Sequence, residues 1–110
     1  MYYTQFCFEL GHPIVSLKKL NRVKKYFAEV RLDVFGFRGV DFELDGLELT
    51  DIILPDYYTS FHDAELFARM LSDAVIDGEI TLLFSDDEMR KFVVTKYGVV
   101  EYRAVWVRQN

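Results

Sequence analysis

The sequence predicts an α+β fold, in which two helices pack on an antiparallel or mixed sheet. Three observations support this prediction. Of the 110 residues, 51% are hydrophobic and 16% are aromatic, which is enough apolar material for one packed core. Segments with alternating apolar and polar residues, typical of half-buried strands, outnumber the segments with helical periodicity. Two helices are too few to connect all these strands in parallel, so we expect a single domain over residues 1–110 with the order β-α-β-β-β-α-β-β-β.

Residues 1–10 alternate as a strand does. One face of this strand carries Tyr2, Thr4, Phe6, Phe8 and Leu10. The Gly-His-Pro sequence at 11–13 is predicted to end it. Cys7 is the only cysteine, so no disulfide can form within the chain, and its apolar surroundings predict a buried thiol.

Residues 16–27 have helical periodicity, with Ser16 as the predicted N-cap. Their apolar face contains Leu17, Leu20, Val23 and Phe27. The opposite face contains Lys18, Lys19, Arg22 and Lys25. Residues 29–35 alternate again and predict a second strand.

Residues 39–54 give a strong hairpin signal, because acids alternate with apolar residues on both sides of Asp45-Gly46. If these two residues form the turn, Glu43 lies opposite Glu48. The same register places Leu44 opposite Leu47 and Phe42 opposite Leu49. Directly opposed like charges are destabilising, so the hairpin would need an offsetting cation or partner, unless its charges only guard an edge strand against aggregation.

Residues 55–58 are predicted to form a loop, and a second helix begins after Ser60, with Asp63 near a capping-box position. Its apolar stripe consists of Ala64, Phe67, Leu71, Ala74 and Val75. Gly78 is the expected end of this helix.

The C-terminal part predicts a three-stranded meander, with strands at 79–84, 89–96 and 99–108. Residues 85–88 and 96–98 supply the turns. One face of the last strand would present Val100, Tyr102, Ala104 and Trp106.

Charge is segregated along the chain, although the net charge is only −5. Residues 14–31 have six basic residues against one acid, residues 32–88 have fifteen acids against two basic residues, and residues 89–110 have five basic residues against one acid. Two interpretations fit this layout. The segments face each other within the fold and form weak surface ion pairs, or they form a polarised surface that docks on a partner.

No motif predicts catalysis. The sequence Asp-Phe-Glu-Leu-Asp-Gly at 41–46 is similar to the start of a calcium loop, but Ile52 stands where the loop needs its bidentate glutamate. His12 and His62, the only histidines, lack zinc-site spacing, and no phosphate-binding loop or nucleophile motif is present. We therefore expect no enzyme activity, no cofactor and no metal.

The charge layout favours a small adaptor or inhibitor, similar to immunity or anti-defence proteins, that binds another protein with a basic surface. The candidate contacts are Asp41, Glu43, Asp45, Glu48, Asp56, Tyr57 and Tyr58. One alternative is a self-associating structural protein, a possible homodimer, whose strand at 99–107 pairs at a sheet edge. Another is nucleic-acid binding by the basic helix at 16–27, which the nearby acids disfavour.

The sequence predicts a location in the cytoplasm. No segment approaches the ~18 apolar residues of a membrane-spanning helix. The first residues lack the basic region and the apolar run of a signal peptide. A single cysteine is also compatible with a reducing compartment.

Overall fold

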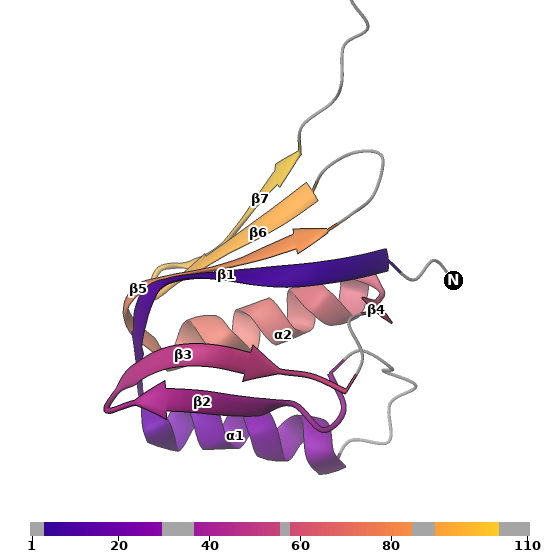
Figure 1. Cartoon of the computed structure of the whole chain (residues 1–110). Coiled ribbons are helices and arrows are strands. Elements are labelled where there is room, and N and C mark those ends of the chain that lie inside the picture. Colours follow the sequence, from indigo (N-terminus) through magenta and orange to yellow (C-terminus); the bar gives the residue numbers. More distant parts are fainter. Residues whose placement is uncertain (1–3, 30–36, 56–57, 85–89, 104–110) are drawn as a thin grey trace, which may run out of the picture.

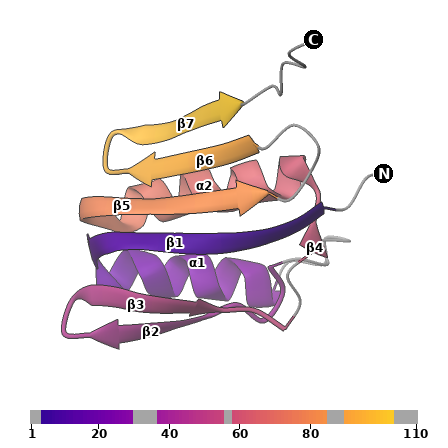
Figure 2. The same cartoon turned by 45° about the horizontal axis from the view of Figure 1, so that its top comes forward.

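The computed structural model describes residues 4–29, 37–55, 58–84 and 90–103. One sheet has the strand order β2-β3-β1-β5-β6-β7, and every pair of neighbours is antiparallel. Both helices pack on the same face of this sheet (Figure 2). The predicted α+β fold is therefore confirmed. The elements are β1 (Thr4–Val15), α1 (Leu17–Glu29), β2 (Asp41–Asp45), β3 (Glu48–Ile53), β4 (Tyr58–Thr59), α2 (Phe61–Ala74), β5 (Val75–Phe84), β6 (Arg90–Thr95) and β7 (Gly98–Arg103).

Two of the predicted segments correspond only loosely to the observed order. The strand expected at 29–35 lies outside the described residues, except for Glu29, which ends α1. The short strand β4 lies where a loop was expected and pairs with the beginning of β1. The meander is present as β5, β6 and β7, with β6 and β7 joined at Lys96-Tyr97. β5 begins at Val75, four residues before its predicted start. The predicted turn at 85–88 and the predicted end of the last strand at 104–108 lie outside the described residues.

The prediction that β1 ends at residues 11–13 is wrong. β1 continues through the Gly-His-Pro sequence because its register against β5 shifts there, which absorbs the irregular backbone. His12 adopts a positive φ of 49° within this irregular stretch. Figure 1 shows that β1 bends toward its C-terminal end and that its last part turns toward the β2–β3 hairpin. The hairpin therefore joins β1 near its end, where Ile14 pairs with Glu48 and the Val15 N–H donates to the Leu47 carbonyl at 2.9 Å.

Both predicted N-caps are present. The Lys19 N–H donates to Ser16 Oγ at 3.4 Å at the start of α1. At the start of α2, the Asp63 N–H donates to Ser60 Oγ at 3.3 Å, and the Ser60 hydroxyl donates to Asp63 Oδ2 at 2.9 Å. The predicted apolar stripes are buried, with the exception of Leu17, the first residue of α1, which is 44% exposed. Val75, predicted as the end of the α2 stripe, is buried as the first residue of β5.

Gly78 does not end α2. The helix ends at Ala74, and the chain continues directly into β5. Gly78 lies within β5 with a φ of 77°, and a Cβ at this position would lie 2.6 Å from the His12 carbonyl oxygen and 2.9 Å from Pro13 Cα. A glycine is therefore needed here for the close approach of β5 to the irregular part of β1.

The core lies between the helices and the sheet and is rich in phenylalanine. Phe37 and Phe67 stack with ring centroids 4.2 Å apart, and Phe27 of α1 contacts both rings. Phe6 of β1 extends the cluster to the sheet. These side chains are at most 2% exposed, so the aromatic cluster connects both helices with the central strand.

Cys7 is exposed, contrary to the expectation of a buried thiol. Phe6 and Phe8 on either side of it point to the helices, and side chains alternate along a strand, so Cys7 lies on the outer face of the sheet. That outer face, the side away from α1 and α2, carries the charged residues described next.

Candidate acidic binding face

The β2–β3 hairpin turns one residue later than predicted. Asp45 pairs with Glu48, so Gly46 and Leu47 form the loop, and Leu44 pairs with Leu49. Gly46 has a φ of 61°, which suits the first position of a two-residue hairpin loop. The predicted pairs of Leu44 with Leu47, Glu43 with Glu48, and Phe42 with Leu49 are therefore wrong.

A bulge in β3 changes the partners further along the hairpin. The register shifts between Leu44 and Glu43, so that Glu43 pairs with Asp51 and Thr50 is the extra residue. Thr50 and Asp51 are both exposed, whereas Leu49 and Ile52 on either side are buried. The bulge keeps both apolar residues in the core and adds one more acid to the outer face.

Four acids form what we call the acidic face: Glu43, Asp45, Glu48 and Asp51. They occupy two directly opposed pairs, Glu43 with Asp51 and Asp45 with Glu48, on the side of the hairpin away from the helices. Within the described part of the chain, Glu43, Asp45 and Asp51 form no ion pair. Each opposed like-charge pair costs roughly 0.2–1 kcal/mol of hairpin stability.

The neighbouring strands extend this negative surface. Asp77 of β5 lies opposite Ile14, in the same row as Glu48, and Glu79 lies opposite Gly11. Both acids are exposed. The nearest cationic candidate is His12, whose Nδ1 lies 3.4 Å from Glu48 Oε1 and which is charged only when protonated. The acidic face therefore continues across β1 onto β5 with little neutralisation.

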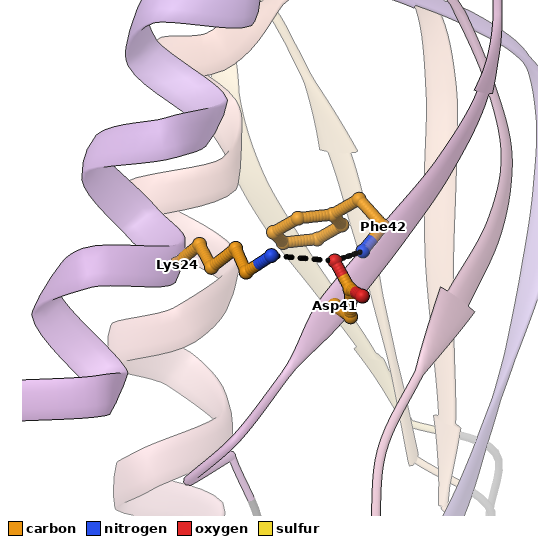
Figure 3. A network of polar contacts seen from close by, with 3 residues as sticks. All are labelled: Lys24, Asp41 and Phe42. Carbon is orange, nitrogen blue, oxygen red and sulfur yellow. Dashed lines mark hydrogen bonds and ion pairs between the residues drawn. The ribbon is translucent and has the colours of Figure 1, made fainter.

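Asp41 differs from the other predicted contacts because the fold neutralises it. Figure 3 shows Lys24 reaching from α1 to Asp41 at the start of β2. Lys24 Nζ donates to Asp41 Oδ1 at 2.9 Å, and the Phe42 N–H donates to the same oxygen at 2.9 Å. The hydrogen bond from Lys24, then that from Phe42, then the charge of Lys24 hold the pKa of Asp41 below its ordinary value. The carboxylate of Asp41 thus forms an ion pair with Lys24 within the chain.

The basic residues of α1 lie on the other side of the molecule. Lys18, Lys19 and Arg22 are exposed, while Leu20 and Val23 of the same helix face the core. A hollow of about 380 Å³ between α1 and α2 is lined by Lys19, Arg22, Val23, Met70 and Asp73. The acidic face points away from the helices, so Lys18, Lys19 and Arg22 lie on the opposite side of the sheet from it, whereas Lys24 reaches Asp41 on the edge strand β2. This arrangement fits the polarised surface better than internal neutralisation.

The remaining predicted contacts are not brought to the acidic face. Asp56 and Tyr57 lie outside the described residues. The backbone of Tyr58 pairs with Gln5, whereas the turn of the hairpin lies next to Ile14. These two positions of β1 are nine residues apart, which corresponds to roughly 30 Å along an extended strand. Tyr58 therefore belongs to the opposite end of the sheet from Asp45 and Glu48.

Asp51 is the acid of this face that the sequence interpretation missed. The printed sequence contains a signal for it: after the predicted turn at 45–46, apolar residues stand at every second position at Leu47 and Leu49, but the next one, Ile52, follows only after three. A single interruption of this kind in a hairpin indicates a bulge. The bulge places Asp51 opposite Glu43 and gives the acidic face its fourth carboxylate.

The described residues contain no group of three or more histidine, cysteine and acidic side chains that could hold a metal ion. The acids at 86–88 lie outside them. Neither helix of the described part has the length and apolarity needed to cross a membrane.

The chain was compared with protein-family models, curated proteins and solved structures, and none of the three comparisons gave a match.

Proposed function

We propose that this protein acts without catalysis by binding another protein, as a small cytoplasmic adaptor or inhibitor of the immunity or anti-defence kind. Its partner presents a basic surface that covers the acidic face. The observation that carries this proposal is the pairing of Glu43 with Asp51 and of Asp45 with Glu48 on an exposed surface. A chain that keeps two opposed like-charge pairs loses stability, and a cationic partner would offset that loss on binding.

The neighbouring acids support the same conclusion. Asp77 and Glu79 of β5 are exposed beside the acidic face, so a partner could follow one negative surface across β3, β1 and β5. Such a surface accelerates association with a basic protein and weakens with salt. Asp41 is left out of the proposed contact because Lys24 already occupies its carboxylate.

The proposal predicts that charge reversal on the acidic face abolishes partner capture. The variant carrying Glu43→Lys and Glu48→Lys, immobilised and exposed to native host extract at physiological salt, should lose the proteins that the wild type retains. Loss of two carboxylates and gain of two ammonium groups should weaken capture more than about tenfold, as measured by quantitative mass spectrometry.

The matched control carries Glu65→Lys and Asp73→Lys, which change the net charge equally on α2 and leave the hairpin intact. This control should capture the same proteins as the wild type. Equal capture by the hairpin variant, or equal loss in both variants, would refute a contact at the acidic face. Circular dichroism of each variant checks that the fold is retained.

A further inference from the structure

The two outer strands of the described sheet, β2 and β7, carry different charges. β2 has an acid at every second position, whereas β7 has Glu101 and Arg103, with Arg103 Nε 3.2 Å from Glu101 Oε1. An edge strand offers its outward N–H and C=O groups to another strand. Two copies of β2 would bring acids together, but two copies of β7 bring together charges of both signs.

The turn between β6 and β7 determines which backbone groups of β7 are outward. Thr95 pairs with Gly98 across the two-residue loop, and the pair that closes such a loop is hydrogen-bonded. Hydrogen-bonded and non-hydrogen-bonded pairs then alternate along the hairpin. Val99, Glu101 and Arg103 therefore direct their backbone groups to the free edge, and Tyr102 directs its groups to β6.

We propose that two copies of this chain associate through antiparallel pairing of β7 with β7, in the register that places Glu101 of each copy opposite Arg103 of the other. Both residues have outward backbone groups, so each of the two pairs adds backbone hydrogen bonds and a cross-strand ion pair. The two-fold axis passes Tyr102, which meets its counterpart. A continuous sheet results, with the helices of both copies on one face.

The side chains fit this arrangement. Glu101 faces α2, because it lines a hollow together with Arg69 and Phe92, and Arg103 shares its face. Tyr102 lies on the outer face and is 50% exposed, and Val100 beside it is 52% exposed. Pairing would cover part of this apolar surface. The ion pairs form on the helix side and the tyrosine pair forms on the outer side.

Other registers allowed by the outward groups fit less well. A shift of the axis to Glu101 places that carboxylate opposite its own copy, which is unfavourable. A further shift to Val100 leaves Glu101 opposite Val99 and removes the charge match. The chosen register is the one in which both charged residues of β7 meet an opposite charge.

The proposal predicts self-association that depends on these charges. Sedimentation from about 5 to about 500 µM should show a rising mass for the full chain, as expected for a weak dimer. Glu101→Arg or Arg103→Glu alone should raise the dissociation constant more than about tenfold, because each brings like charges together. A mixture of the two variants, or the double exchange in one chain, should restore association. A wild-type monomer throughout, or single variants that still associate, would overturn the proposal.

The register has a separate test. In a Cys7→Ser background, Tyr102→Cys should form a disulfide-linked dimer under mild oxidation, because opposed non-hydrogen-bonded residues lie within disulfide range. The control Val100→Cys should link poorly, and preferential linking of that variant would overturn the register. The Glu43→Lys and Glu48→Lys variant should dimerise like the wild type, which separates this proposal from partner binding at the acidic face.

Discussion

β2 and β7 lie at opposite ends of one antiparallel sheet and expose the same kinds of backbone groups, but their side chains differ. β2 carries Asp41, Glu43 and Asp45 and no basic residue. β7 carries one acid, Glu101, and one base, Arg103. Tyr102 lies between them and Val100 precedes them, and both of these side chains are exposed. The comparison teaches that side chains, more than backbone geometry, decide what an edge strand can accept.

The neighbouring strands strengthen this contrast. The acids of β2 pair with further acids on β3, so the hairpins of two copies of this chain would repel each other. β6 instead places Lys91 opposite Tyr102, with Nζ 5.2 Å from the ring centroid, and Val93 opposite Val100. One end of the sheet therefore suits a basic partner, and the other end suits a strand like itself.

The largest effect should come from breaking the junction that connects these two ends. Gly78→Ala would place a methyl group 2.6 Å from the His12 carbonyl oxygen in a backbone conformation with a φ of 77°. The strain and the displaced strand should lower the free energy of unfolding by more than about 2 kcal/mol. Urea unfolding followed by circular dichroism measures this loss.

Gly46→Ala provides the matched control for that change. Gly46 also has a positive φ, of 61°, but no atom lies within 4 Å of the position of an added Cβ. Only the conformational strain applies, so the loss should be about 1 kcal/mol. If Gly78→Ala lowers the free energy of unfolding no more than Gly46→Ala does, the close approach of Gly78 to β1 does not contribute to the cost of the substitution.

A smaller effect should sharpen the comparison of the two edges. Glu43→Gln removes the repulsion between Glu43 and Asp51, so the free energy of unfolding should rise by about 0.2–1 kcal/mol at low salt. The gain should shrink in about 1 M NaCl, where charges are screened over a few ångströms. Thermal unfolding at both salt concentrations measures it.

Glu101→Gln on β7 is the counterpart. It removes the acid that contacts Arg103, so the stability of the monomer should not rise. An equal gain from both substitutions would show that the net charge, and not the opposed pair on the hairpin, sets the effect.

The smallest effect concerns Asp41 and the pH dependence of stability. Because the folded-state pKa of Asp41 is lowered, chiefly by the hydrogen bond from Lys24, the contact stabilises the fold above the ordinary aspartate pKa of about 3.9. That stabilisation is lost as the pH falls through the lowered value. Lys24→Met should raise the pKa of Asp41 toward its ordinary value and make the acid loss of stability shallower. NMR titration of the Asp41 carboxyl measures the pKa.

Lys18→Met removes an equal charge from the exposed side of α1 and should leave the Asp41 titration unchanged. An Asp41 pKa that does not respond to Lys24→Met would contradict the assignment of Lys24 as the main cause.

Much of the fold could be predicted because it depends on neighbours in the chain. Ser60 with Asp63 marks the beginning of α2, and Phe67 with Leu71 marks its buried stripe, since both signals follow from helical spacing. The β2–β3 hairpin was predicted for the same reason. The turn was misplaced by one residue, and Leu47 in the observed turn also accepts a hydrogen bond from the Val15 N–H, a contact from outside the hairpin.

The sequence by itself determined that two helices are set among a larger number of strands, which faces of α2 and of the hairpin are apolar, and that acids concentrate in the middle of the chain. Only the tertiary structure decided that Asp51 opposes Glu43, that Lys24 neutralises Asp41, and that Gly78 serves β1 rather than α2. The physical reason is the distance along the chain over which the interactions act. Periodicity arises from bonds between near neighbours, whereas register, bulges and cross-strand charge depend on which distant strand lies alongside.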